Sequence, residues 1–271
     1  MNFTEKLITA SRKNKSLLCV GLDPDPELMP DKVGIFEFNK VIIDATSDLV
    51  CAYKLNLAFY EVLEAEGLNV LKRTIEYIPD DMPVIGDAKR GDIGNTAKAY
   101  AKTIFSNFNF DAATVNPYLG FDSIEPFIQY RDKGVFILCR TSNVGALDFQ
   151  SLRCESESTY RSLFELVALK AKQWNTYGNI GLVVGATYPE ELRLIRNSHP
   201  DMPLLIPGIG AQGGELASAV RYGVDSQGEK AIISSSRQII YASSEKDFAQ
   251  AARRVASSLR DQINSYRANT T

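Results

Sequence analysis

The sequence predicts an α/β protein of the (β/α)8 barrel class, a single domain over residues 1–271. Short apolar runs rich in β-branched residues recur about eight times along the chain, and helical patterns lie between them. The length of 271 residues suits eight such units, and no Gly/Ser-rich or Pro-rich linker divides the chain. An open doubly wound sheet is the alternative. It is less favoured because eight units fit the length well.

The chain begins with a mixture of charged and apolar residues at helical spacing, which predicts an N-terminal helix over residues 1–15. Continuous apolar runs then indicate parallel strands covered on both faces. In chain order the predicted strands are 17–22, 50–55, 83–87, 112–115, 135–139, 180–184, 204–206 and 231–233. Residues 35–49 and 96–107 are examples of the amphipathic helices expected between them.

One interval, between the strands at 135–139 and 180–184, is longer than the others. It contains the polar run Cys154-Glu155-Ser156-Glu157-Ser158, which we interpret as a solvated loop with a helix start, followed by a helical pattern up to Trp174. The sequence therefore predicts an enlarged loop and helix region at about 143–178 within the same domain.

Composition narrows the choice of partners and compartment. The formal net charge of −3 predicts no strong attraction to nucleic acid or to an anionic membrane. No apolar run approaches the ~20 residues that span a bilayer, and residues 1–15 lack the core of a signal peptide. The four cysteines form no CxxC pair, and with one histidine no zinc site is expected. We expect a cytoplasmic protein with reduced cysteines.

Polar residues follow the predicted strands at their C-terminal ends, where barrel enzymes carry their catalytic groups. They form a ring that faces one end of the barrel: Asp23, Lys54, Asn56, Asp87, Lys89, residues 140–143, residues 207–210, Ser236 and Arg237. The last members indicate a phosphate site, because the loops after strands seven and eight often bind phosphate. Gly208 and Gly210 allow close backbone approach, and Arg237 can clamp an anion.

A charged cluster is predicted around the third strand. Asp87 and Lys89 are two residues apart, so their side chains point the same way in an extended chain, and Lys54 and Asp92 can complete a Lys-Asp-Lys-Asp array. A structural ion-pair network is the ordinary interpretation of such a cluster, but its place at the barrel mouth favours function. Lys89 between carboxylates should be protonated and therefore a proton donor. Asp87 would repel a substrate carboxylate by ~4 kcal/mol at ~4 Å and an effective dielectric of ~20.

The run Asp87-Ala88-Lys89-Arg90-Gly91-Asp92-Ile93-Gly94-Asn95-Thr96-Ala97 resembles the signature of the orotidine 5'-phosphate decarboxylases, in their longer-chain (type 2) subgroup. The resemblance covers essentially the whole chain. Its other motifs are Gly21-Leu22-Asp23-Pro24-Asp25, Tyr53-Lys54-Leu55-Asn56, Val115-Asn116-Pro117-Tyr118-Leu119-Gly120, Arg140-Thr141-Ser142-Asn143, Pro207-Gly208-Ile209-Gly210-Ala211-Gln212-Gly213-Gly214 and Ser234-Ser235-Ser236-Arg237. Shorter-chain relatives often have Gly where this chain has Ser236, a difference that we expect to have little effect on phosphate binding.

The resemblance implies a cofactor-free enzyme that converts orotidine 5'-phosphate to uridine 5'-phosphate and CO2 in pyrimidine biosynthesis. By the same resemblance, the catalytic residues are Lys89, which protonates C6 of a carbanion, Asp87, which faces the leaving carboxylate, Lys54 and Asp92. The implied substrate-binding residues are Asp23 and Asn56 for the ribose, Ser142 for the pyrimidine, Gln212 for base and phosphate, and Pro207, Gly208, Gly210, Ser236 and Arg237 for the phosphate. It also implies a homodimer in which Asp92, Ile93 and Thr96 serve the partner subunit's site.

Two other functions remain open at this point. The first is a related enzyme that acts on a phosphorylated sugar through a magnesium-stabilised enediolate, such as a hexulose-phosphate synthase or a keto-gulonate phosphate decarboxylase. It shares Asp-x-Lys-x-x-Asp but requires a further acidic metal ligand. The second is a barrel that binds a nucleotide without catalysis, against which the intact Asp87, Lys89 and Asp92 argue.

Overall fold

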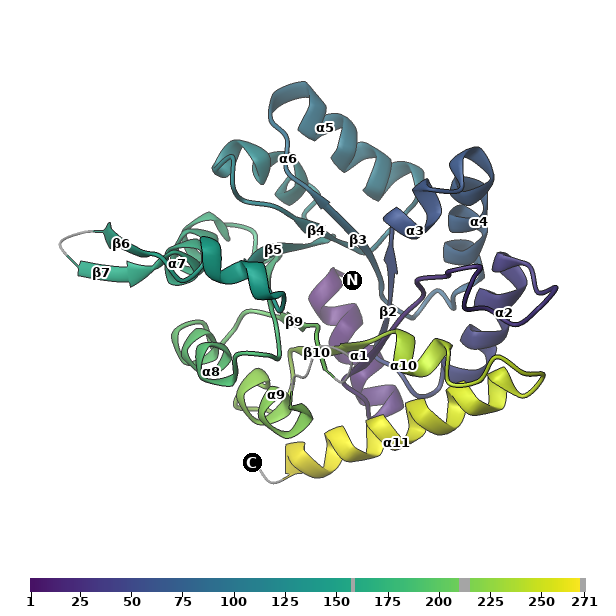
Figure 1. The fold of residues 1–271 in the computed structure, drawn as a ribbon. Helices are drawn as coiled ribbons and strands as arrows, with labels where there is room; N and C mark the ends of the chain where they lie inside the picture. The colour runs from purple at the N-terminus through teal and green to yellow at the C-terminus, as the bar shows by residue number, and fades with distance from the viewer. Residues whose placement is uncertain (157–158, 210–214, 269–271) are drawn as a thin grey trace.

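Eight parallel strands close into a barrel in the order β1-β10-β9-β8-β5-β4-β3-β2 (Figure 1). The structure is a computed structural model that describes residues 1–156, 159–209 and 215–268. The barrel strands are β1 (Leu18–Gly21), β2 (Ala52–Asn56), β3 (Val84–Arg90), β4 (Ala112–Val115), β5 (Gly134–Arg140), β8 (Ile180–Val184), β9 (Leu204–Ile206) and β10 (Ala231–Ser235). The closed order confirms the predicted (β/α)8 barrel and excludes the open doubly wound sheet.

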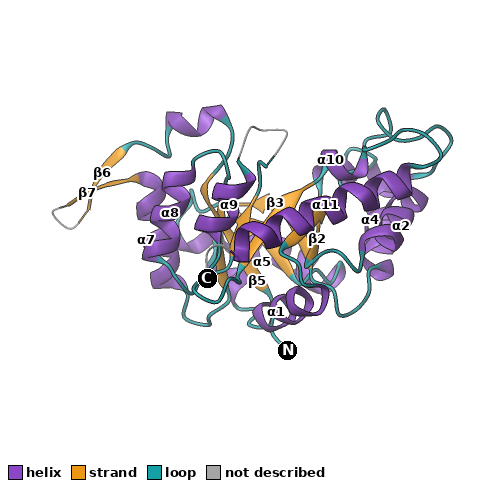
Figure 2. Ribbon diagram, turned by 90° about the horizontal axis from the view of Figure 1, so that it is seen from below, coloured by secondary structure: helices purple, strands orange, loops and turns teal. Residues whose placement is uncertain are grey.

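Helices alternate with these strands along the chain and surround the barrel (Figure 2). The longer ones are α1 (Phe3–Asn14), α2 (Ile35–Thr46), α4 (Glu64–Tyr77), α5 (Gly94–Lys102), α7 (Leu163–Trp174), α8 (Pro189–Ser198), α9 (Leu216–Gly223) and α11 (Phe248–Ala268). Short helices are α3 (Ala58–Glu61), α6 (Glu125–Ile128), α10 (Arg237–Ile240), the 3-10 helices η2 (Phe121–Ser123) and η3 (Val144–Asp148), and the π-helical turn η1 (Thr103–Asn107) that continues α5. In the described part of the chain, no helix is long and apolar enough to cross a membrane.

The apolar strand runs arise because each strand is buried on two faces. The larger core cluster lies between strands and helices and contains, for example, Val20, Ile137 and Leu259. A smaller cluster takes one residue from each barrel strand and so fills the barrel interior. Its strand members are Cys19, Ala52, Ile85, Ala112, Phe136, Val183, Leu205 and Ile232.

Helix α1 closes the N-terminal end of the barrel. Its Phe3 and Leu7 join the inner cluster, and the rings of Phe3 and Phe136 meet edge to face with centroids 5.5 Å apart. A Cβ atom at Gly134 would lie 2.5 Å from the Phe3 ring, so glycine there gives the ring its space. The helix and the interior ring together form an apolar floor beneath the open end of the barrel.

The region predicted as an enlarged loop and helix contains η3, a two-stranded antiparallel sheet and α7. The sheet joins β6 (Arg153–Ser156) to β7 (Thr159–Ser162) and projects from the barrel (Figure 1). The predicted loop was wrong for residues 154–156, which lie in β6; residues 157 and 158 lie outside the described residues. Both strands are largely exposed, so their sequences lack the alternation of apolar and polar residues that identifies a half-buried strand.

The floor predicts a stability effect for Phe3→Ala. Phe3 is buried, so removing its ring should lower the free energy of unfolding by about 3 kcal/mol, measured by urea denaturation. The matched control is Phe149→Ala, because Phe149 is 63% exposed and its loss should change stability by less than about 0.5 kcal/mol. Equal effects of the two substitutions would contradict the role given to α1.

Candidate active site

The polar site lies one layer above the apolar floor. Side chains two residues apart on a strand share a face, so the residues that follow the floor positions also point into the barrel. On β2 the step leads from Ala52 to Lys54, and on β3 from Ile85 to Asp87. The chain thus changes from apolar to charged within one step, at the C-terminal end of the barrel where strand ends meet.

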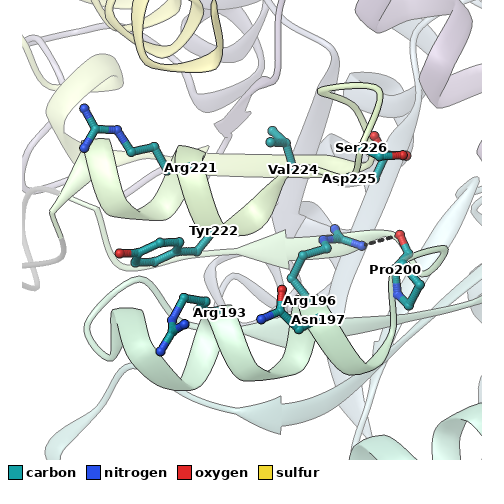
Figure 3. A pocket seen from close by; sticks show the side chains of 9 residues that line it. All are labelled: Arg193, Arg196, Asn197, Pro200, Arg221, Tyr222, Val224, Asp225 and Ser226. Carbon is teal, nitrogen blue, oxygen red and sulfur yellow. Dashed lines mark hydrogen bonds between the residues drawn. The ribbon is translucent and has the colours of Figure 1, made fainter. Parts of the chain in front are cut away.

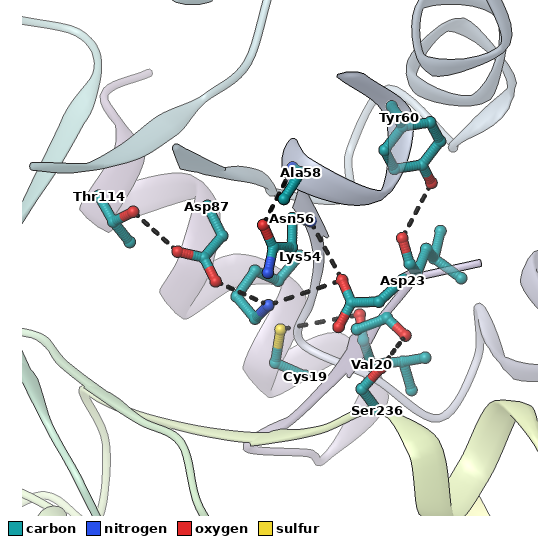
Figure 4. A network of polar contacts seen from close by, with 12 residues as sticks. Cys19, Val20, Asp23, Lys54, Asn56, Ala58, Tyr60, Asp87, Thr114 and Ser236 are labelled. Carbon is teal, nitrogen blue, oxygen red and sulfur yellow. Dashed lines mark hydrogen bonds and ion pairs between the residues drawn. The ribbon is translucent and has the colours of Figure 1, made fainter. Parts of the chain in front are cut away.

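Asp87 is the centre of an ion-pair cluster. One carboxylate oxygen accepts from Lys54 Nζ at 3.1 Å, and the other accepts from Thr114 Oγ1 at 2.9 Å (Figure 4). The second oxygen also accepts from Lys89 Nζ at 2.6 Å. Lys54 Nζ also lies 3.9 Å from Asp23 Oδ1. The side chains of Lys54 and Asp87 are only 8% and 11% exposed, whereas that of Lys89 is 49% exposed. Lys89 is therefore the more exposed of the two cations that Asp87 binds.

The neighbouring charges fix the protonation states of the buried pair. Burial alone would lower the pKa of Lys54, but the carboxylates of Asp23 and Asp87 outweigh burial and raise it. Burial would raise the pKa of Asp87, but the two lysines and their hydrogen bonds hold it well below its usual range. Lys54 is therefore an ammonium and Asp87 a carboxylate near neutral pH.

The backbone at Lys89 is not regular strand. Its φ of 47° lies in the left-handed region, which costs a non-glycine residue about 1 kcal/mol. The pairing of β3 with β4 shifts register between Gly86 and Arg90, and Lys89 N donates to Thr114 Oγ1 at 3.0 Å. The spacing of Asp87 and Lys89 correctly predicted that their side chains meet. The extended backbone assumed for both residues was wrong at Lys89. A strained residue held by its neighbours is typical of functional sites.

Two tyrosines hold the loop that carries Asp23. Tyr60 donates to the carbonyl oxygen of Leu22 at 2.9 Å, and Tyr241 donates to that of Asp23 at 2.8 Å. Burial raises the pKa of Tyr241 to about 12, so its hydroxyl stays protonated. Asp23 Oδ1 in turn accepts from Asn56 N at 3.1 Å, which fixes the end of β1 against the end of β2.

A cavity of about 330 Å³ opens beside this cluster. Its lining includes seven of the predicted site residues: Asp23, Lys54, Asn56, Pro207, Gly208, Ser236 and Arg237. Gly208 has a φ of 95°, a conformation that favours glycine. Arg237 is the first residue of α10 and forms no ion pair with any described residue. Gly210 and Gln212 lie outside the described residues.

Six predicted site residues do not line this cavity. Asp87 and Lys89 belong to the cluster beside it, and the other four lie elsewhere. Asp92 does not join the lysine cluster as the predicted array required: no ion pair links it to a lysine among the described residues, and its carboxylate accepts from Ile93 N at 2.8 Å. Ile93 and Thr96 are exposed around the start of α5. Ser142 does not line the cavity, and its carbonyl oxygen accepts from Thr187 Oγ1 at 3.3 Å.

Sequence reasoning missed several members of the site. Thr114 donates a hydrogen bond to Asp87. The sequence feature that could have indicated this role is the single hydroxyl residue in the otherwise apolar run 112–115. Phe59 and Gln238 line the cavity from the helices that follow β2 and β10, where no pattern distinguishes them from ordinary helix residues. Ser234 and Ser235 also line it.

A second groove, of about 420 Å³, lies between α8 and α9 on the outside of the barrel (Figure 3). Its largest buried polar group is Arg196, which donates to five backbone carbonyl oxygens, among them those of Gly223 and Met202. Burial lowers the pKa of Arg196 to about 10. The groove is at the end of the barrel opposite the charged cluster, because its residues come from the C-terminal halves of α8 and α9 and the turns that follow. Its buried arginine serves the fold.

The chain is similar to known proteins over nearly its whole length. The orotidine 5'-phosphate decarboxylase / HUMPS family matches residues 16–255. Orotidine 5'-phosphate decarboxylase of Dehalococcoides mccartyi (strain CBDB1) is 57% identical over 98% of this chain and 99% of its own length, and that of Ralstonia pickettii (strain 12J) is 51% identical over 98% and 100%. The structure of Leishmania donovani OMP decarboxylase superposes with a TM-score of 0.86 at 40% identity, covering 99% of this chain and 100% of that one. The chain belongs to the orotidine 5'-phosphate decarboxylase / HUMPS family.

Proposed function

We propose that this enzyme decarboxylates orotidine 5'-phosphate to uridine 5'-phosphate and CO2, a step of pyrimidine biosynthesis, without a cofactor. The observation that carries the proposal is the Lys54–Asp87–Lys89 cluster beside a cavity that also exposes Arg237. The cluster suits a carboxylate that must leave and a carbon that must gain a proton. The guanidinium suits the phosphate of the same substrate. Family membership supports this choice of substrate.

In the proposed reaction the substrate carboxylate lies against Asp87. Their repulsion, ~4 kcal/mol at ~4 Å and an effective dielectric of ~20, raises the free energy of the bound substrate. The bond between C6 and the carboxylate carbon breaks, CO2 leaves, and the electron pair stays on C6. The Lys89 ammonium stabilises this carbanion and transfers a proton to C6. Lys89 then regains a proton from solvent, for which its half-exposed side chain is suited.

The remaining predicted residues bind the rest of the nucleotide in this proposal. Asp23 and Asn56 bind the ribose hydroxyls, and Ser142 recognises the pyrimidine. Gln212 bridges base and phosphate. The phosphate contacts come from Pro207, Gly208, Gly210, Ser236 and Arg237. The positive φ of Gly208 and the lack of an ion pair between Arg237 and any described residue give local support.

We further propose that residues 1–271 act as one barrel domain in a cytoplasmic homodimer. Asp92, Ile93 and Thr96 would then complete the partner subunit's site. Their position supports this: Ile93 is 48% exposed although it is apolar, and Asp92 has no lysine partner among the described residues of its own chain. Ile93 and its neighbours at the barrel mouth would be buried by a second subunit.

The proposed reaction predicts metal-independent turnover. The purified protein should convert orotidine 5'-phosphate to uridine 5'-phosphate equally well with and without a chelator, measured by loss of substrate absorbance. Lys89→Ala should lower kcat at least about 100-fold, because the proton donor is lost. Lys170→Ala, an exposed lysine of α7, is the matched control and should retain full activity. Loss of turnover in chelator would favour a magnesium-dependent enediolate enzyme instead.

The proposed site shared between two subunits can be tested by mixing two inactive variants. Lys89→Ala and Asp92→Asn subunits should each be inactive as homodimers, whereas a mixed dimer should have one intact site. Random pairing of equal amounts should restore about a quarter of the wild-type activity per site. Lys89→Ala mixed with Lys54→Met is the control, because both residues belong to the same subunit's site and no activity should return. If mixed dimers form and the first mixture stays inactive, Asp92 does not serve the partner.

The buried Lys54–Asp87 pair predicts an effect on stability. Lys54→Met removes one of the two ammonium groups that neutralise the buried Asp87 carboxylate. It should therefore lower the free energy of unfolding at pH 7 by about 3 kcal/mol. Lys54→Met/Asp87→Asn, measured by the same urea denaturation, should recover much of that loss. Recovery would be absent if Lys54 stabilised the fold by packing alone.

The pH dependence of stability follows from the lowered pKa of Asp87. Its contribution is present above the unfolded-state pKa of about 3.9 and is lost as pH falls toward the lower folded-state pKa. Asp87→Asn should therefore lose less stability between about pH 5 and pH 3 than the wild type does. Parallel curves for the two proteins would contradict the lowered pKa.

A further inference from the structure

Arg140 is the last residue of β5 and is fully buried. The pairing of β5 with β8 shifts between Leu138, opposite Val183, and Arg140, opposite Val184, so Cys139 is an extra residue in the strand. Such a bulge changes the direction in which the next side chain points. Cys139 contacts the backbone of α7, and Arg140 reaches α8.

The guanidinium of Arg140 joins the segment that follows β5 to the segment that follows β8. Its Nε donates to Glu191 of α8, and its Cζ lies 3.7 Å from the centre of the Tyr188 ring. Its Nη1 donates at 3.4 Å to Gln150 Oε1, which lies beyond η3. Nη2 is buried and has no hydrogen-bond partner among the described residues.

Stability alone does not account for this arrangement. A buried ion pair often stabilises a fold no more than apolar side chains of similar volume, and a buried N–H without a partner lowers stability further. Glu191, the only carboxylate paired with Arg140 in the described chain, is itself 29% exposed. What the guanidinium does achieve is a fixed connection between the end of β5, the start of α8 and Gln150.

That connection leads directly to Ser142. Gln150 Oε1 also accepts from Thr141 N at 2.8 Å, and Gln150 Nε2 donates to Thr141 Oγ1 at 2.8 Å. Gly185, which follows β8, lies against the opposite side of the Ser142 backbone. A side chain at position 185 would place its Cβ atom only 2.8 Å from Ser142 N, so the two backbones are in close contact. Ser142 is therefore held between the Arg140–Gln150 contacts and β8.

We propose that Arg140 is a positioning residue for recognition of the pyrimidine base: with Glu191, Tyr188 and Gln150 it fixes the backbone that presents Ser142. The proposal rests on the function given above, in which Ser142 meets the base. Arg140 itself is fully buried and touches no substrate. Its effect is confined to the base end of the ligand, because the phosphate residues belong to the loops after β9 and β10.

The test compares a ligand that has the base with one that lacks it. Binding of uridine 5'-phosphate and of ribose 5-phosphate is measured by calorimetry, which needs no turnover. Arg140→Met should weaken uridine 5'-phosphate binding about ten-fold or more and change ribose 5-phosphate binding less than about two-fold. Arg140→Lys, which keeps the charge, should restore part of the loss. Weakening of both ligands by the same factor would show a general structural role and overturn the proposal.

Two further variants make the result specific to Ser142. Because Arg140 acts through Ser142, Arg140→Met/Ser142→Ala should bind uridine 5'-phosphate within about two-fold of Ser142→Ala alone. Additive losses would overturn the proposal. Arg193→Met is the matched control on α8: Arg193 is exposed and paired with Glu190, and its replacement should leave both ligands unaffected.

If Arg140→Met does not fold, Glu191→Gln and Gln150→Leu weaken the same contacts without removing the buried arginine, and both should show the same base-selective loss. Unchanged binding of uridine 5'-phosphate in both would overturn the proposal. Failure of the wild type to decarboxylate orotidine 5'-phosphate would reject the proposed function separately, because the binding comparison does not depend on turnover.

Discussion

The pairing of Lys54 with Asp87 is the interaction on which the site depends. Each side chain is about nine-tenths buried, and moving either charge from water into the barrel alone would cost several kcal/mol. Together, and with Asp23, Lys89 and Thr114 around them, each charge is compensated. The apolar floor beneath them lowers the local dielectric constant on that side, which strengthens the attraction. The cluster is therefore ordered before any ligand arrives.

The position of Lys89 follows from the same cluster. Its ammonium is held by Asp87, and its backbone nitrogen by Thr114, so a left-handed conformation that a lysine would not adopt by itself persists. The cost of about 1 kcal/mol is small beside the energy of the ion pairs. About half of the side chain remains exposed. The buried Lys54–Asp87 pair thus fixes the position of the Lys89 ammonium.

The sequence was sufficient for the barrel because each strand is a short apolar run between helices, and for much of the site because parallel strands end at the same side. It was not sufficient where geometry depends on partners far away in sequence. The bulge that turns Arg140 toward α8 and the left-handed Lys89 are set by pairing with β8 and β4. The exposed β6–β7 sheet is held by its own backbone pairing, which leaves no hydrophobic pattern. The lysine array that spacing predicted for Asp92 was wrong, since its carboxylate accepts from Ile93 N and pairs with no lysine among the described residues.

The two ends of the substrate meet opposite surroundings under the proposed reaction. The substrate carboxylate is repelled by Asp87, and this repulsion lowers the net binding free energy of the ground state. Arg237 and the backbone around Gly208 lie on the loops after β10 and β9, where an anion is attracted. Binding at this remote end offsets the repulsion at the reacting end, and the repulsion disappears as CO2 leaves. A substrate without its phosphate should thus lose rate as well as affinity, because the attraction that holds the carboxylate against Asp87 is no longer present.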